Sequence, residues 1–219
     1  MQLRHYQLEA CKAVLDYWGN GGGNPLVDLA TGTGKSLVIA ALTQRMIRDY
    51  PEIRVLMLTH QRELIRQNTE ELLRIWPQAP VGINSAGLGR RDKRSQILFA
   101  SIQSVARESA LTLGERHLII VDEAHLISRN SSSMYQTLLA KLREAVPDLR
   151  VLGCSATPFR MDSGRLDEGK DKLFDKIVFS YGIAQGVEDG FLSPLVARKT
   201  GQVIDVSGVA RREREEGTP

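Results

Sequence analysis

Short apolar runs alternate along the chain with longer segments in which apolar residues recur every three or four positions. The short runs are rich in Val, Ile and Leu, as buried strands are, and they lie at residues 25–30, 54–60, 96–101, 117–124 and 150–156. The periodic segments predict amphipathic helices over residues 35–50, 61–76 and 131–146. A further helix is expected over residues 5–18, with an apolar stripe of Leu8, Cys11, Val14, Leu15 and Trp18.

Strands that alternate with helices predict an α/β fold, in which a mostly parallel sheet has helices on both faces. A length of 219 residues suits one large domain of this kind. In such sheets, ligands bind in the crevice outside the carboxyl ends of the strands. The polar motifs of this chain follow predicted strands at those ends, which indicates one functional edge of the sheet.

Composition restricts the class of protein without naming a function. With 42% hydrophobic and 25% charged residues, the sequence is typical of an ordinary globular domain. No apolar run approaches the roughly 20 residues that a membrane span needs, so no membrane partner is expected. The first ten residues lack the apolar stretch of a secretory signal, and we expect a cytoplasmic protein. Cys11 and Cys154 lie far apart, without metal-ligand spacing, and are expected to be buried packing residues.

The net charge of +3 permits a nucleic-acid partner without requiring one. Basic residues are densest in one segment, at Arg90, Arg91, Lys93 and Arg94. These side chains are candidates for phosphate contacts, although such a run is more often a solvated loop. The sequence leaves both interpretations of this cluster open.

The segment DLATGTGKSL, residues 28–37, ends like a phosphate-binding loop but has Leu29 where the general pattern has glycine. It follows a predicted strand and precedes a predicted helix, which is the order that phosphate binding needs. The glycines would let backbone N–H groups approach, Lys35 would reach the β and γ phosphates, and the Ser36 hydroxyl would hold Mg²⁺. The alternative is a glycine-rich turn without a ligand, but the Lys-Ser pair favours a nucleotide site.

Two acids, Asp122 and Glu123, follow the apolar strand in LIIVDEAH, residues 118–125. Unpaired carboxylates at a strand end are costly, so a cation is the natural explanation. Asp122 suits Mg²⁺, directly or through water, and Glu123 suits the general base that polarises the attacking water. A surface acidic turn is the alternative for an isolated pair, and the phosphate loop upstream favours the catalytic interpretation.

Three motifs, LATGTGKS, VDEAH and CSATP, follow predicted strands in this order and resemble motifs I, II and III of the superfamily 2 helicases and translocases. Motif I of that superfamily does not require glycine at the place of Leu29. The resemblance implies a RecA-like P-loop NTPase fold, ATP and Mg²⁺ as cofactors, and movement on nucleic acid. It also implies nucleotide contacts from Thr31, Gly32, Thr33, Gly34, Lys35 and Ser36.

The segment LRHYQLEA is similar to the upstream adenine-recognition segment of the superfamily. By this resemblance, Gln7 contacts adenine, while Arg4 and Tyr6 help to frame the base. Coupling between nucleotide state and movement is implied for His125, Ser155 and Thr157. The alternative for the histidine is a structural residue with satisfied hydrogen bonds, and its place directly after the catalytic acids favours coupling.

Two further segments resemble nucleic-acid motifs of the superfamily: LTHQRELIRQN is similar to motif Ia, and FASIQSV is similar to a later motif. The side chains implied to contact or support the strand are Thr59, His60, Arg62, Gln67, Ser101, Gln103 and Ser104. Short hydroxyl and amide side chains position phosphates without reading sequence. For most of these residues, helix capping or packing is an equally good explanation.

The segments LRHYQ, GKSLVIA, SAGL, SIQSVAR, ATPFR and DGFLSP together resemble the RadD-like bacterial helicases, with type I restriction translocases as more distant relatives. The resemblance runs to about Pro194. It implies a DEAH-box motor, DNA rather than RNA as the track, and a role in DNA repair. Cys154 departs from it, since threonine is expected at the start of motif III.

Residues 1–194 are therefore expected to form a first RecA-like motor domain, and residues 195–219 to begin a linker toward a second RecA-like domain outside this sequence. The second domain would supply arginine fingers, which contribute about 10³ to 10⁵ to the rate of phosphoryl transfer. This chain alone is expected to bind nucleotide weakly and barely hydrolyse it. Two alternatives stay open: a nucleotide-dependent module that binds nucleic acid or a partner without unwinding, and a subunit of a restriction-type DNA translocase.

Overall fold

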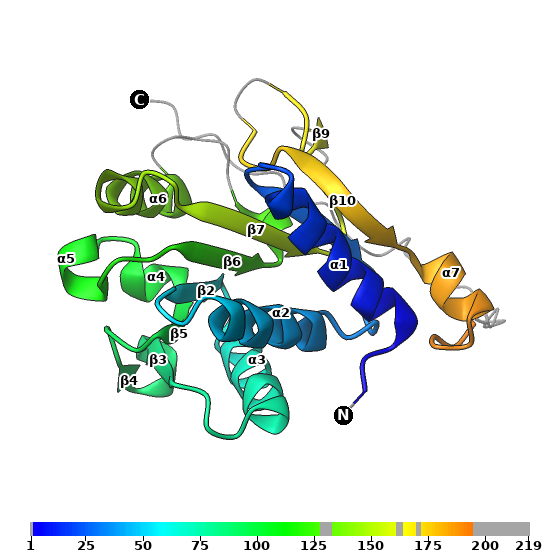
Figure 1. Cartoon of the computed structure of the whole chain (residues 1–219), viewed down its shortest axis with the longest axis horizontal. Helices are drawn as coiled ribbons and strands as arrows, with labels where there is room; N and C mark the ends of the chain where they lie inside the picture. Colours follow the sequence, from blue (N-terminus) through cyan, green and yellow to red (C-terminus); the bar gives the residue numbers. More distant parts are fainter. Residues whose placement is uncertain (1, 128–132, 161–163, 170–171, 195–219) are drawn as a thin grey trace, which may run out of the picture.

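One sheet organises the chain, and the computed structural model describes residues 2–127, 133–160, 164–169 and 172–194 of it (Figure 1). The strands of the sheet are β1 (Pro25–Leu29), β2 (Val55–Thr59), β3 (Val81–Ser85), β4 (Arg90–Arg91), β5 (Ile97–Ser101), β6 (Leu118–Asp122), β7 (Arg150–Ser155) and β10 (Lys176–Tyr181). A separate antiparallel hairpin consists of β8 (Phe159–Arg160) and β9 (Gly164–Arg165).

The spatial order of the sheet is β10-β1-β7-β6-β2-β5-β3-β4. Neighbouring strands pair in parallel, except β3 with β4 at one edge. The helices are α1 (His5–Gly19), α2 (Lys35–Asp49), α3 (Arg62–Ile75), α4 (Ile102–Val105), α5 (Ala110–Leu113), α6 (Met134–Ala145) and α7 (Ile183–Glu188), with short 3₁₀ turns η1 (Ala86–Leu88) and η2 (Ala124–Leu126).

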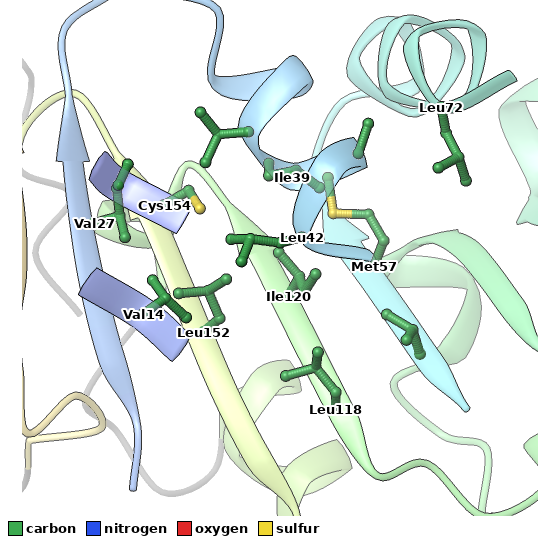
Figure 2. Packing of buried hydrophobic residues seen from close by; sticks show 14 of the residues in the cluster. Val14, Val27, Ile39, Leu42, Met57, Leu72, Leu118, Ile120, Leu152 and Cys154 are labelled. Carbon is green, nitrogen blue, oxygen red and sulfur yellow. The ribbon is translucent and has the colours of Figure 1, made fainter. Parts of the chain in front are cut away.

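Side chains alternate between the two faces of the strands, as a pleated backbone requires. On one face, α1, α2 and α3 pack against alternate strand residues, including Val27, Met57, Ile120 and Leu152 (Figure 2). On the other face, α4, α5 and α6 pack against the intervening residues, including Leu26, Leu56, Ile119 and Val151. The predicted α/β class, a mostly parallel sheet with helices on both faces, is confirmed.

Strand order brings distant motifs together at the carboxyl edge of the sheet. β7 lies between β1 and β6, so Asp28 pairs with Ser155 and Asp122 with Cys154. β2 lies beside β5, where Thr59 pairs with Ser101. The first group of strand ends carries the phosphate loop and motifs II and III, and the second carries the expected nucleic-acid residues.

Several features differ from the sequence expectations, among them the following. β3 and the edge strand β10 were not predicted, because VGINS lacks a continuous apolar run and edge strands need less burial. Leu8 is 52% exposed, so it does not belong to the buried stripe of α1. The buried face of that helix is turned toward Tyr6 and Gln7, whose side chains bond to the phosphate loop. Cys154 is buried as expected, whereas Cys11 is only partly buried.

Some expectations fall on residues without a structural description. The expected linker at 195–219 lies outside the described residues, as do Ser131 and Ser132 at the start of the helix expected over 131–146. None of the helices within the described ranges is both long enough and apolar enough to cross a membrane.

Candidate functional site

The phosphate loop depends on two glycines with left-handed backbone angles, Gly32 at φ +85° and Gly34 at φ +82°. Side chains at such angles are strained. A Cβ at Gly34 would also lie only 2.6 Å from Gln7 Nε2. The Thr33 hydroxyl donates to Ala30 O at 2.6 Å, which closes the turn before α2 begins at Lys35. The loop therefore presents the N-terminus of a 15-residue helix, a favourable place for an anion.

A pocket of about 480 Å³ opens over this loop. Its lining includes every expected nucleotide residue except Tyr6, together with both acids of motif II: Arg4, Gln7, Thr31, Gly32, Thr33, Gly34, Lys35, Ser36, Asp122 and Glu123. Residues that were not expected complete the wall: Gln2, Leu37, Leu64, Gln67, Glu71 and Arg74. The tertiary structure thus brings the motif I and motif II side chains into one cavity.

Asp122 is a buried carboxylate, with only 2% of its surface exposed. Burial raises the pKa of this carboxyl, while the hydrogen bond from Asn68 acts to lower it. Asn68 Nδ2 donates to Oδ2 at 3.0 Å, and the backbone N–H of Glu123 donates to Oδ1 at 3.0 Å. Two donors therefore hold the carboxylate in one orientation within the pocket.

The oxygen atoms of this pocket fit Mg²⁺. Ser36 supplies a hydroxyl and Asp122 a carboxylate, and both line the same cavity. A hydroxyl and a carboxylate suit Mg²⁺, because this ion keeps several waters and is usually held by one or two protein oxygens together with substrate phosphates.

Glu123 has the only positive φ angle of a non-glycine residue in the described structure, at +54°. Strained backbone of this kind clusters at functional sites. Its Oε1 lies 3.1 Å from Lys35 Nζ, and its Oε2 lies 3.4 Å from His125 Nδ1. The side chain is 23% exposed, so water can reach it from the pocket.

His125 extends this set of contacts to motif III. Its Nδ1 lies 2.9 Å from Ser155 Oγ, and the tautomer decides which atom donates. The Ser155 hydroxyl in turn accepts from the backbone N–H of Thr157 at 3.1 Å. The expected proximity of these three residues is therefore present, while their role in coupling stays a prediction.

Of the three residues expected to recognise adenine, two line the pocket and one does not. Arg4 is exposed at the pocket, and Gln7 lines it while donating from Nε2 to Thr33 O at 2.9 Å. Tyr6 does not line the pocket and is fully buried. Its hydroxyl donates to Thr33 O at 2.8 Å, and its ring stacks on Tyr181 with centroids 4.0 Å apart. Tyr6 therefore supports the loop from below, which corrects the expectation that it frames the base.

Five of the seven expected nucleic-acid residues line a second hollow of about 500 Å³: His60, Arg62, Ser101, Gln103 and Ser104. The other two do not. Thr59 is fully buried at the end of β2, so it cannot touch a strand and at most supports its neighbours. Gln67 lines the phosphate pocket instead, where its Nε2 lies 3.4 Å from Ser36 Oγ. Helix α3 separates these positions because Gln67 lies more than one turn beyond Arg62.

Asn68 is a candidate functional residue that the sequence analysis missed. It is 1% exposed and shares the buried stripe of α3 with Ile65, Thr69 and Leu72. The signal that could have identified it is an asparagine among the apolar positions of an amphipathic helix, because a buried amide needs a polar partner. Only the fold identifies that partner as Asp122.

Comparison with known proteins agrees with this geometry. The family described as "Type III restriction enzyme, res subunit" matches residues 1–160. IRC3 of Saccharomyces cerevisiae, a protein assigned as an ATP-dependent helicase, is 31% identical over 198 residues, which cover 87% of this chain and 28% of IRC3. The type I restriction enzyme EcoAI endonuclease subunit of Escherichia coli is 24% identical over 211 residues, 94% of this chain and 25% of that subunit. The chain thus spans about a quarter of the length of these relatives.

Solved structures share the fold. The UvsW helicase from bacteriophage T4 superposes with a TM-score of 0.61 at 18% identity, over 82% of this chain and 60% of that one. The type ISP restriction-modification enzyme LlaGI, solved with a DNA substrate mimic, gives a TM-score of 0.61 at 17% identity, over 87% of this chain and 21% of that one. Given the match over residues 1–160, the chain belongs to the type III restriction enzyme res subunit family, whose members carry superfamily 2 RecA-like motor domains.

Proposed function

We propose that this chain is the nucleotide-binding half of an ATP-dependent motor that moves along nucleic acid or unwinds it. The observation that carries the proposal is a continuous path of contacts from the phosphate loop to motif III. It runs from Lys35 to Glu123, then through His125 to Ser155. Such a path allows the state of the γ-phosphate to shift a second segment of the chain, which a protein that merely binds nucleotide does not require.

In the proposed reaction, the loop N–H groups and Lys35 bind the phosphates, while Ser36 and Asp122 hold Mg²⁺. Bound there, Mg²⁺ would neutralise charge that develops on the phosphates. Lys35 would exchange its contact with Glu123 for phosphate oxygens. The carboxylate of Glu123 would then be free to accept a proton from the attacking water.

We propose that the nucleic acid along which the motor moves is DNA. The support is that one matched structure was solved with a DNA substrate mimic and that a relative from Schizosaccharomyces pombe, 26% identical, is named as a DNA helicase. We also propose that a second RecA-like domain completes the site. Membership of the RadD-like, DEAH-box group and a role in DNA repair are proposed on the sequence resemblance alone.

The test is ATP hydrolysis by the full-length protein, measured with and without DNA. We expect DNA to raise turnover, and Glu123→Gln to lower it by about 10² or more, the usual contribution of a general base. Nucleotide affinity should persist in that variant. The matched control is Glu52→Gln, because Glu52 is exposed and precedes β2 at the opposite edge of the sheet. If DNA does not change the rate of ATP hydrolysis, but nucleotide still controls the binding of nucleic acid or a partner, the binding-module alternative is supported instead.

A further inference from the structure

The four cations of the basic cluster differ in whether their side chains already have a polar partner. Arg90 lies 2.9 Å from Asp92, and Lys93 lies 3.0 Å from Glu108. Arg94 donates to the backbone carbonyl of Leu111 at 2.7 Å. Of the four cations, Arg91 is the one whose side chain makes no hydrogen bond or ion pair with any residue that the structure describes.

Arg91 is also the one member of the cluster that lines the second hollow. It lies on β4, pairs with Asn84 of β3, and is exposed. The rest of the lining comes from the ends of β3 and β5, the segment after β2, the turn η1 and the first residues of α3 and α4: His60, Gln61, Arg62, Glu63, Ser85, Ala86, Gly87, Ser101, Gln103 and Ser104. Strand β4 therefore contributes one side of the hollow that the resemblance did not include.

The lining of this hollow has two arginines but one acidic side chain. Arg62 is paired with its neighbour Glu63 at 2.7 Å, the one acid in the lining. Arg91 is thus the arginine of the lining without a counter-charge, in a hollow that Gln103 and Ser104 also line with an amide and a hydroxyl. Amide and hydroxyl groups and a free guanidinium are the donors that bind phosphate oxygens.

The hairpin that carries Arg91 is held in place before any ligand arrives. Asp92 Oδ2 accepts from the backbone N–H of Ile83 at 2.9 Å, which closes β3 onto β4. The buried Arg116 donates to the backbone carbonyls of Lys93 at 2.8 Å and Ser95 at 2.9 Å. A fixed backbone lowers the entropy that Arg91 would lose on binding.

We propose that Arg91 binds a phosphate of the nucleic-acid backbone, so that the β3–β4 hairpin belongs to the track-binding surface. This inference rests on the proposed function, because it assumes that nucleic acid crosses the hollow. Phe, Tyr and Trp are missing from its described lining, so base stacking contributes little there. The contact would therefore be indifferent to base sequence.

The test compares Arg91→Ala with the wild type in the full-length protein. Binding of a fluorescent single-stranded oligonucleotide is followed by anisotropy over a range of salt concentrations. We expect affinity to fall about tenfold, the size of one charge-assisted hydrogen bond. The slope of log affinity against log salt should become shallower by about 0.7, the value for one phosphate contact on a single strand. Arg91→Lys should restore most of the slope.

Lys93→Ala is the matched control, since it removes the same charge from a position two residues beyond Arg91, but from a side chain paired with Glu108. Its slope should stay close to that of the wild type. If the wild type binds but Arg91→Ala leaves affinity and slope unchanged, or if Lys93→Ala flattens the slope equally, the assignment of Arg91 fails and the proposed function stands. If the wild type shows no binding to nucleic acid, both are overturned.

Discussion

Asp122 is the buried charge at the centre of the nucleotide pocket, and Asn68 is the side chain that orients it. The amide donates to Oδ2 from a position with 1% exposure, so water cannot replace it. Side chains that orient a metal ligand typically contribute a factor of about 10 to 100 in metal affinity or activity. At the scale of single residues, the proposed Mg²⁺ site therefore depends on a residue outside motifs I and II.

Replacing Asn68 by Ala should weaken the binding of Mg²⁺ at the nucleotide site. We expect the Mg²⁺ concentration needed for half-maximal binding to rise by about 10- to 100-fold, because Asp122 loses its orienting donor. Calorimetric titration with nucleotide at a series of Mg²⁺ concentrations would measure it.

Asn84→Ala is the matched control, since Asn84 is also buried but lies in β3, outside the pocket lining. An Asn68→Ala variant with the Mg²⁺ dependence of the wild type would show that the hydrogen bond to Asp122 is incidental.

Arg116 is fully buried at the amino edge of the sheet, where its side chain links several elements. Burial lowers its pKa to about 9, which leaves it protonated at neutral pH. Its guanidinium donates to backbone carbonyls of three segments: Val55 at the start of β2, Leu113 at the end of α5, and the chain before β5. One side chain therefore satisfies acceptors that strand pairing leaves open.

Arg116→Lys should lower the free energy of unfolding by about 2 to 3 kcal/mol, because an ammonium cannot reach all these carbonyls and buried acceptors left unpaired are costly. Chemical denaturation would measure the change. Arg107→Lys serves as the control, since Arg107 is exposed, and should change stability by no more than about 0.5 kcal/mol. Equal effects of the two substitutions would contradict the structural role of Arg116.

At the scale of the whole molecule, the chain places two cavities on one edge of the sheet. The phosphate pocket lies at the ends of β1 and β6, and the second hollow lies at the ends of β2, β3 and β5. Helix α3 joins them, since Arg62 lines the hollow and Gln67 lines the pocket. Helix α3 therefore offers a rigid element through which binding in one cavity can influence the other, as the proposed motor would require.

If a second RecA-like domain completes the site, as proposed, hydrolysis by residues 1–219 alone should be slower than hydrolysis by the full-length protein by about 10³ to 10⁵, the contribution of an arginine finger. Steady-state ATPase measurements with DNA present would compare them, with Lys35→Ala in each to define the background. Rapid DNA-stimulated turnover by residues 1–219 would show that the site needs no second domain.

The sequence by itself determined the alternation of strands and helices and the identity of the three motifs. It could do so because hydrophobic period and motif spacing are local properties of the chain. Five of the strands and four of the helices were predicted on this basis, and the loop from Thr31 to Ser36 lies where the pattern placed it.

Only the tertiary structure determined which of these residues contact one another. Strand order inserts β7 between β1 and β6, which sets Ser155 beside the motif II acids, and helix packing buries Tyr6 beneath the loop. It also places Gln67 in the phosphate pocket, and it places Arg91, whose side chain has no polar partner in the described structure, in the hollow that Ser104 also lines. These contacts join residues far apart in the chain, or depend on how a helix is rotated against the sheet. No local pattern specifies such contacts, because packing across the whole core determines them.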